Sequence, residues 1–343
     1  MVAVAAVACR TPTATDCRRV TVELRSGEDE GERVAFTVGD QGDRVEVDVG
    51  DRLRVYENQL PEGAVIGGVR VDRYALADFE RRSSLLWLTA AFAVLVVAAG
   101  GWRGLRALFG LAGSLAIVVL FVVPAILDGQ SPLTVAFVGA LAIMLVTIPL
   151  AHGLGPKTLA AMLGTAASLI LTLTLANVFT GLTHLTGLSS DEAIFLRATS
   201  GDISIRGLLL AGMVIGALGV LDDLTVSQSS TVMALRRANP RLGFGELFRS
   251  ALAVGHDHIA ATVNTLVLAY AGASLPVLLI FSISDTSFAD AVNNEAVAEE
   301  IVATLVGSIG LIAAVPVTTA LAALLAVRLD AGALTDEHGA HAH

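Results

Sequence analysis

The stretch GLLLAGMVIGALGVLDDLTVSQSS, residues 207–230, begins with fifteen uncharged and mostly apolar residues, which are followed by two adjacent aspartates, Asp222 and Asp223. A helix through residues 207–235 would be about 43 Å long and would carry both carboxylates near its middle. An ionisable group at that depth in a bilayer costs at least about 2.5 kcal/mol, so it is expected to face protein or water. The stretch therefore predicts a membrane helix with a polar site in it.

The rest of the chain is similarly apolar. Its 343 residues are 54% hydrophobic and only 16% charged, and the apolar residues occur in long runs. A bilayer core about 30 Å thick needs roughly 20 apolar residues per helix. Seven regions meet this requirement: 84–101, 107–127, 132–151, 158–183, 207–235, 259–282 and 301–327. We expect an α-helical integral membrane protein with about seven transmembrane helices, whose helical domain covers residues 84–328.

The first eighty residues have a different pattern. The stretches RRVTVELR, RVAFTV, RVEVDVGD and RLRVYE alternate apolar and polar residues at period two, with glycine-rich turns between them. This pattern predicts a small antiparallel β-domain over residues 1–80. The domain is mildly acidic, which is not the signature of a nucleic-acid binder.

Loop charges predict the orientation. Basic residues follow the first, third, fifth and seventh spans, whereas the alternate loops carry mostly Asp and Glu. Because basic loops remain in the cytoplasm, the β-domain is expected outside and the polar tail, residues 329–343, inside. The opening MVAVAAVACR has neither a basic region nor the apolar length of an export signal, so we expect a further segment before it in the full-length protein.

The two cysteines, Cys9 and Cys17, both belong to this external segment. A disulfide that closes a short loop is chemically permitted there, and two free thiols are the equally weighted alternative.

Helical spacing distinguishes the two central aspartates. Asp223 continues a face of small residues formed by Gly212, Gly216 and Gly219, which predicts that Asp223 lies on the packed side and Asp222 about 100° away. The alternative is that both aspartates end a short helix at the cytoplasmic interface and contact water.

A second polar strip lies in GHDHIAATVNTLVLAYAGASLP, residues 255–276. Asp257 and Asn264 share one helical face and His258 begins the neighbouring one. We expect the fifth and sixth helices to be neighbours, with Asp223 and Ser227 directed at this strip, because each polar row needs a polar partner. His256 and His258 diverge on a helix, so a metal site is not expected, and a helix cap at Asp257 is the simpler interpretation.

The chain has no Walker A loop, no Gly-x-Ser-x-Gly, no His-Glu-x-x-His and no Gly-x-Gly-Asp motif. No cofactor is expected, and an intramembrane enzyme is the least favoured class of function.

Several stretches carry a resemblance to a family. The β-head, GWRGLRAL, LAHGLGPKT, residues 207–240, residues 255–276 and TLVGSIGLIAAVPVTTALAAL together resemble the YibE/F family of bacterial polytopic membrane proteins over roughly residues 20–325. The resemblance implies membrane location and architecture, with a further span before the β-head. The chain is thus expected in the bacterial plasma membrane as a multi-pass protein.

Two classes of function follow from these observations. The leading hypothesis is translocation of a small solute or ion through a polar site formed by Asp222, Asp223, Ser227, Asp257, His258 and Asn264. The alternative is a membrane scaffold whose β-domain binds a protein partner in the cell envelope and whose buried polar groups hold the helices together. The expected partners are otherwise the lipid bilayer and the transported solute.

Overall fold

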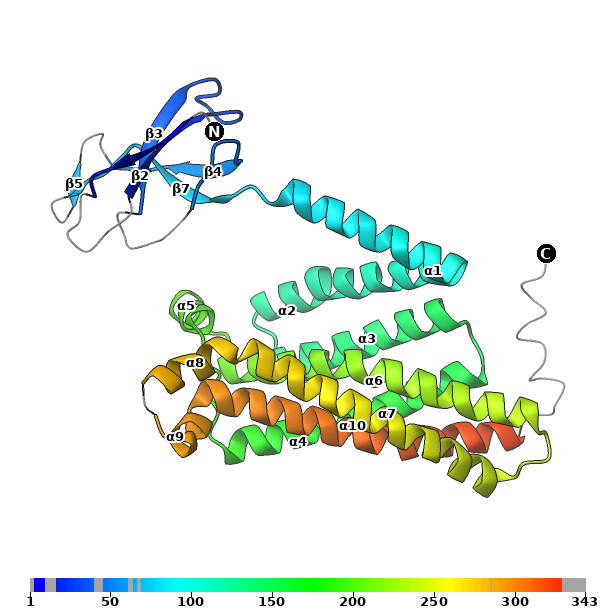
Figure 1. The fold of residues 1–343 in the computed structure, drawn as a ribbon. Coiled ribbons are helices and arrows are strands. Elements are labelled where there is room, and N and C mark those ends of the chain that lie inside the picture. Colours follow the sequence, from blue (N-terminus) through cyan, green and yellow to red (C-terminus); the bar gives the residue numbers. More distant parts are fainter. Residues whose placement is uncertain are drawn as a thin grey trace. The chain divides into compact units, whose positions relative to one another are not determined.

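A computed structural model of the chain describes residues 3–9, 17–39, 46–60, 64–66, 69–284 and 286–328. The chain divides into two compact units, Met1–Leu95 and Val96–His343. Strands and the start of one helix form the first unit, and long helices form the second (Figure 1). A mostly helical chain with a small N-terminal antiparallel sheet is thus confirmed, whereas the predicted tail, residues 329–343, lies outside the described residues.

The helical part contains long helices with short connections. Its elements are α1 (Arg82–Ile117), the π-helix η1 (Val118–Val122), α2 (Val123–Leu127), α3 (Pro132–His152), α4 (Pro156–Leu182), α5 (Asp191–Thr199), α6 (Ile205–Ala238), α7 (Phe244–Ala273), α8 (Leu275–Ile283), α9 (Phe288–Asn293) and α10 (Glu295–Arg328). Serine caps begin several of them: the Ser204 hydroxyl, for example, accepts a hydrogen bond from the Gly207 amide at the start of α6.

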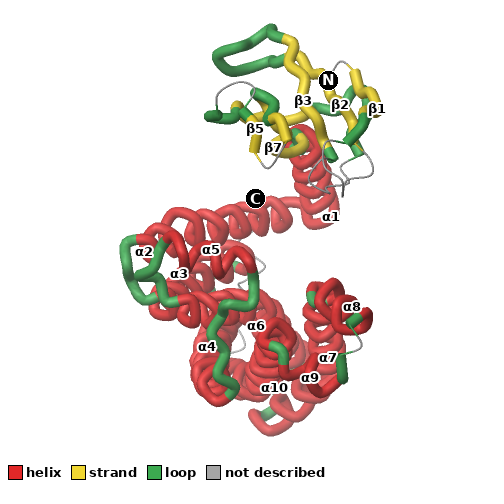
Figure 2. The backbone as a smooth tube through the Cα atoms, turned by 90° about the vertical axis from the view of Figure 1, so that its left-hand side faces the viewer, coloured by secondary structure: helices red, strands yellow, loops and turns green. Residues whose placement is uncertain are grey.

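Helix α6 is the centre of the second unit. It contacts α3, α4, α7 and α10, and α4 and α10 also contact each other (Figure 2). The fully buried side chains of Leu169, Leu221 and Leu311 bring α4, α6 and α10 together in one apolar cluster. A helix surrounded by other helices can carry polar groups away from lipid, so α6 is suited to hold a polar site.

Helix α1 is interrupted at Gly101. This residue has φ of 54°, a left-handed conformation that glycine adopts without strain. After this break, the backbone at Gly104 lies against the residues before it, and a Cβ atom at Gly104 would be 2.2 Å from the Val96 carbonyl oxygen. The helix therefore turns sharply between Val96 and Gly104, and both glycines are needed for the turn.

Five helical stretches among the described residues are long and apolar enough to cross a membrane, or six if α7 and α8 form one broken span. In this count Arg82–Leu127 is one stretch, where the sequence predicts two spans on either side of the Gly101 break. A straight helix of 46 residues would be about 69 Å long, more than twice the thickness of a bilayer core. The apolar helices fit a membrane protein, and the total of seven spans stays a prediction.

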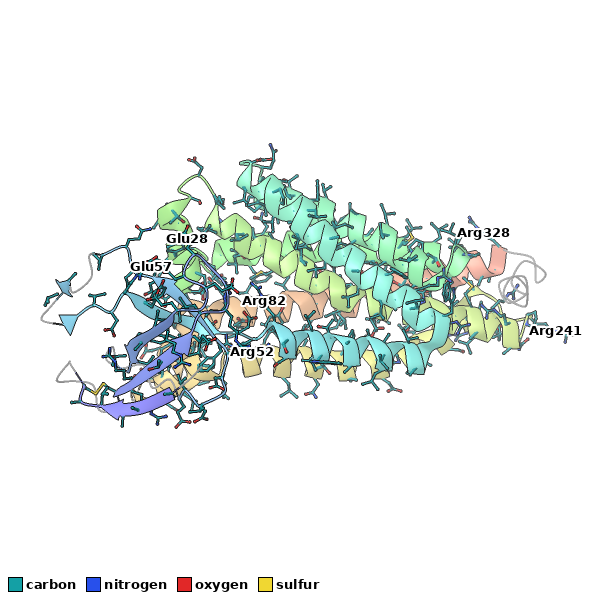
Figure 3. The ribbon with its side chains drawn as sticks, turned by 90° about the horizontal axis from the view of Figure 1, so that it is seen from above. Glu28, Arg52, Glu57, Arg82, Arg241 and Arg328 are labelled. Carbon is teal, nitrogen blue, oxygen red and sulfur yellow. A yellow bond between two sulfur atoms is a disulfide. The ribbon has the colours of Figure 1, made fainter. Side chains whose placement is uncertain are left out.

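The predicted sixth span, residues 259–282, is not one straight helix. Helix α7 begins earlier, at Phe244, and bends by 56° into α8 after Ala273. Arg241 and Arg328 both lie at the opposite end of the second unit (Figure 3). This end carries the basic residues that follow α6 and end α10.

The described residues of the first unit form three small antiparallel sheets. Its strands are β1 (Ala3–Val7), β2 (Cys17–Glu23), β3 (Arg33–Val38), β4 (Leu53–Glu57), β5 (Val65–Ile66), β6 (Val69–Arg70) and β7 (Tyr74–Phe79). Strand β2 pairs with β1 and β3, β4 pairs with β7, and β5 pairs with β6. Three of the four predicted strand stretches correspond to β2, β3 and β4. In RVEVDVGD the described residues, 46–51, form no strand, although Val47 is buried in the core.

The core of this unit is formed by the inward residues of β2 and β3, including Val20, Val22 and Phe36, and by Tyr74. The Tyr74 hydroxyl donates a hydrogen bond to Asp29, which joins β7 to the hairpin loop between β2 and β3. This hydrogen bond, together with burial, raises the pKa of Tyr74 to about 12.

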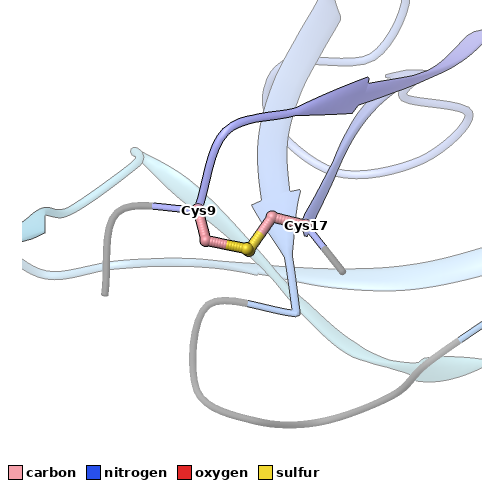
Figure 4. Close-up of a disulfide and its surroundings, with 2 residues drawn as sticks. All are labelled: Cys9 and Cys17. Carbon is pink, nitrogen blue, oxygen red and sulfur yellow. A yellow bond between two sulfur atoms is a disulfide. The ribbon is translucent and has the colours of Figure 1, made fainter. Parts of the chain in front are cut away.

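Cys9 and Cys17 form a disulfide, with a Cα–Cα distance of 5.1 Å (Figure 4). Cys17 is the first residue of β2 and Cys9 follows β1. The bridge therefore joins the ends of two paired strands, and of the two alternatives that the sequence leaves open, the structure has the disulfide.

We expect neither cysteine of the untreated protein to react with iodoacetamide and both to react after reduction. Closing a loop of this length stabilises a fold by about 2–3 kcal/mol, so reduction should speed hydrogen exchange of the slowest β2 amides by roughly 30- to 150-fold. Mass spectrometry of the labelled and the exchanged protein measures both effects. Alkylation without reduction would show that the thiols are free.

Candidate functional site

Asp222, not Asp223, lies on the packed face of α6. The buried residues of α6 include Leu218, Leu221, Thr225 and Gln228, and Asp222 shares this face with Leu218 and Thr225 at helical spacing. Asp223 is exposed, as are Gly212, Gly216 and Gly219. The prediction that Asp223 and the glycine row face the protein interior is therefore wrong, because the larger apolar side chains of α6 take the packed positions.

The Asp222 carboxyl group lies between three helices. It interacts with the hydroxyls of Thr165 on α4 and Thr147 on α3, while the Thr225 hydroxyl on α6 contacts the Asp222 carbonyl oxygen at 3.2 Å. The Thr165 and Thr225 hydroxyl oxygens are 2.7 Å apart. We call Asp222, Thr147, Thr165 and Thr225 the Asp222 cluster.

One carboxyl oxygen in this cluster has no partner. The Oδ1 atom of Asp222 is buried and forms no hydrogen bond with any residue that the structure describes. No ion pair within the described ranges neutralises Asp222 either. A buried carboxyl group with free acceptor capacity can bind a proton or a cation, and leaving it without a partner is costly in a protein interior.

The neighbouring carboxylate has a different environment. Asp223 is near enough to His152, at the end of α3, for an electrostatic interaction between their side chains. His152 also interacts electrostatically with Lys157 and Arg106. These basic residues follow the first and third predicted spans. Asp223 is thus an exposed member of a mixed charged surface and does not belong to the Asp222 cluster.

Buried hydroxyls continue from the Asp222 cluster along α4. Ser168 and Thr172 follow Thr165 at helical spacing, and their hydroxyl oxygens are buried without a hydrogen-bond partner among the described residues. The Thr318 hydroxyl oxygen on α10 is also buried without a hydrogen-bond partner among the described residues. The sequence identifies the row of Thr165, Ser168 and Thr172, and the structure places it at the contact of α4 with α6 and α10.

Helices α4 and α10 are in very close contact at two points. A Cβ atom at Gly164 would lie 2.0 Å from the Thr318 Oγ1 atom, and a Cβ atom at Gly310 would lie 2.0 Å from the Thr172 Oγ1 atom. Each helix thus offers one glycine and, eight residues later, one threonine to its antiparallel partner. This pair of reciprocal contacts, the Gly–Thr pairs, holds the hydroxyl row against α10.

The polar strip of the sixth predicted span is not part of this interior. Helices α6 and α7 are in contact, as predicted, but Asp257, His258 and Asn264 are exposed. In the part of the chain that the structure describes, no hydrogen bond joins these three residues to Asp223 or to Ser227, which is partly buried. The two predicted groups are therefore on neighbouring helices without forming one hydrogen-bonded site.

Gln228 provides the polar contact between α6 and α7 instead. Its Nε2 atom donates to the Ala251 carbonyl oxygen of α7 at 2.7 Å and to the Thr319 hydroxyl of α10 at 2.8 Å. Gly255 makes this contact possible, since a Cβ atom there would lie 3.0 Å from the Oε1 atom of Gln228 and 2.5 Å from the Cγ1 atom of Val315. Sequence reasoning missed Gln228 and Thr147, although the spacing of Gln228 from Thr225 indicates that both share one helical face.

At the other end of α10, acidic residues hold the loop before α5. Glu295 accepts hydrogen bonds from the Thr186 hydroxyl and the Gly187 amide, and the Ser189 hydroxyl donates to Glu299. These carboxylates therefore anchor the loop to α10. Across the described ranges, no group of three His, Cys, Asp or Glu side chains is arranged to hold a metal ion.

Comparison with known proteins gives one match. The model of a family described as YibE/F-like protein matches residues 88–328, well over half of the chain. The match includes α2 to α10 and therefore the whole Asp222 cluster. No curated protein and no solved structure matches the chain.

Proposed function

The chain belongs to the YibE/F family, and we propose that it moves protons or a small cation across the bacterial plasma membrane through the Asp222 cluster. One observation carries this proposal: a carboxyl group half-way along a 34-residue apolar helix keeps a buried oxygen atom without a partner. Ionisable residues inside membrane helices are costly, and they typically mark ion pathways and proton relays.

The surroundings of Asp222 support a cation or a proton as the transported species. The hydroxyls of Thr147 and Thr165 interact with the carboxyl group, and the Thr225 hydroxyl oxygen is 2.7 Å from that of Thr165. Carboxylate and hydroxyl oxygens are ligands of hard cations, and a row of hydroxyls can pass a proton, because each hydroxyl both donates and accepts. Ser168 and Thr172 extend the row along α4 by two further groups.

The orientation belongs to the same proposal. Basic residues gather where α6 and α10 end, near Arg241 and Arg328, which we assign to the cytoplasm (Figure 3). The β-unit is then outside, where its disulfide is chemically stable.

Labelling of single cysteines in intact cells tests this orientation. With Cys9 and Cys17 joined, a new cysteine at the exposed Ala198 in α5 should react with a membrane-impermeant maleimide. A cysteine at the exposed Ser250 in α7 should react only after the cells are opened. The reverse pattern would contradict the proposed placement of both loops.

Flux measurements on the purified full chain in liposomes test the transport proposal. A potassium gradient with valinomycin imposes a membrane potential, and trapped dyes report internal proton and sodium concentrations. We expect faster entry of one of these cations than into liposomes without protein. If neither cation enters faster than into liposomes without protein, although the protein is folded and inserted, the transport proposal is contradicted and the scaffold alternative is favoured.

A further inference from the structure

The β-unit contains a cavity that the transport proposal does not use. The cavity has a volume of about 750 Å³ and lies where β2 ends, β4 begins and α1 starts. Its charged lining residues are Arg25, Arg52, Arg54, Arg82, Glu23 and Glu80. Figure 3 shows Arg52 and Arg82 close to the point where α1 begins. All of these residues belong to the first compact unit.

The charge of the cavity is opposite to that of the chain. The protein has a formal net charge of −10, yet four guanidinium groups meet only two carboxylates here. Glu80 is already engaged, since it accepts a hydrogen bond from the Arg82 amide and is 3.7 Å from the Arg82 guanidinium. Arg25 and Arg52 have no ion pair with any described residue, so their charge is available to a ligand.

The position of the cavity along the chain indicates what the ligand is. Arg82 is the first residue of the apolar stretch Arg82–Leu127, and the side chains of Leu86 and Trp87 on its first turns are exposed. Where such a helix enters a bilayer, its first residues lie among the lipid headgroups, and tryptophan is typical of that level. The cavity therefore lies at headgroup level on whichever side of the membrane the β-unit is placed.

We propose that this cavity binds the phosphate group of an anionic phospholipid, with Arg25, Arg52 and Arg82 as its ligands. The guanidinium group matches phosphate geometry with two parallel hydrogen bonds and is weakly hydrated, which suits a site at the membrane surface. The exposed apolar side chains on the first turns of α1 accompany the lipid's acyl chains. The β-unit is thereby held against the bilayer through this site, independently of any flux through the helices.

Native mass spectrometry of the full chain in detergent tests the proposal. The protein is titrated with phosphatidylglycerol, with phosphatidylcholine and with inorganic phosphate. We expect tight binding of phosphatidylglycerol and weaker binding of phosphatidylcholine. The Arg25→Gln/Arg52→Gln variant should bind phosphatidylglycerol roughly tenfold less tightly, since two charge-assisted contacts are removed.

A matched variant controls for the loss of charge. Arg19→Gln/Arg33→Gln removes two positive charges from exposed positions on β2 and β3 that do not line the cavity, and it should bind like the wild type. Arg52→Lys keeps the charge but loses the two-pronged geometry, and it should bind with intermediate affinity. Slow hydrogen exchange of the β2 amides shows in each variant that the β-unit is folded.

The possible outcomes distinguish a phospholipid from a soluble phosphate as the ligand of the cavity. Equal binding of both lipids, or unchanged binding by Arg25→Gln/Arg52→Gln, would overturn the proposal. Tight binding of inorganic phosphate that displaces phosphatidylglycerol would overturn the lipid as ligand and identify a soluble phosphate as the natural one. The proposal is supported if Arg25→Gln/Arg52→Gln weakens phosphatidylglycerol binding, Arg19→Gln/Arg33→Gln does not, and inorganic phosphate binds without high affinity.

Discussion

Replacing Asp222 by asparagine is expected to reduce cation flux to the level of liposomes without protein. Asparagine has nearly the same shape, but it carries no charge and cannot exchange a proton with the hydroxyls of Thr165 and Thr147. The fold should persist, because the Oδ1 atom of Asp222 forms no hydrogen bond with any described residue that the substitution would break. The dye assay in liposomes measures the flux, and size-exclusion chromatography reports the fold.

The adjacent residue provides the matched control. Asp223→Asn makes the same chemical change one position along α6, at an exposed site near His152, and it should retain most of the flux. Thr165→Val removes one hydroxyl from the Asp222 cluster and should slow the flux without abolishing it. Equal loss in Asp222→Asn and Asp223→Asn would show that the interior carboxyl group has no special role.

Gly164→Ala is expected to destabilise the helical unit by about 2–3 kcal/mol, a typical cost of overpacking in a tightly packed core. The new Cβ atom would lie 2.0 Å from Oγ1 and 3.2 Å from Cα of Thr318, so rotation of the threonine side chain cannot relieve the clash. Helices α4 and α10 would have to separate. The temperature at which the purified protein loses its monodisperse chromatographic peak measures the effect.

A second substitution should restore the contact. In Gly164→Ala/Thr318→Gly, a methyl group is added on α4 and the threonine side chain is removed from α10, so the stability of the helical unit should largely recover. Gly212→Ala is the neutral comparison, because a Cβ atom at Gly212 has nothing within 4 Å and alanine favours a helix. If Gly164→Ala and Gly212→Ala have the same stability, the close approach of α4 and α10 is incorrect.

Much of the architecture is predictable from the sequence. Runs of about 20 apolar residues locate the helices, and alternation locates β3 at its observed bounds, Arg33–Val38. The interruption of α1 at Gly101 agrees with the sequence, which ends the first predicted span at this residue and begins the second at residue 107. The bend between α7 and α8 has a local cause, because Pro276 in the first turn of α8 has no amide hydrogen with which to continue the hydrogen bonds of α7.

The site is predictable only in part. The sequence identifies the aspartate pair and the hydroxyl row of α4, but it does not determine which aspartate faces inward. Two adjacent residues point about 100° apart, so a small error in the assumed packing face exchanges them. Small residues favour close helix contacts, whereas Leu218 and Leu221 on the other face gain more from burial, and that face is the packed one.

The Gly–Thr pairs also limit how the molecule can move. The two close contacts are about 12 Å apart along the helices and oppose sliding of α4 along α10. We therefore expect the two helices to move together as one rigid body. Helix α7 is different, because its buried residues, Leu247, Ala251 and Gly255, all lie in its first half. For the proposed transport, we therefore expect the second half of α7 to move and the α4–α10 pair to stay fixed.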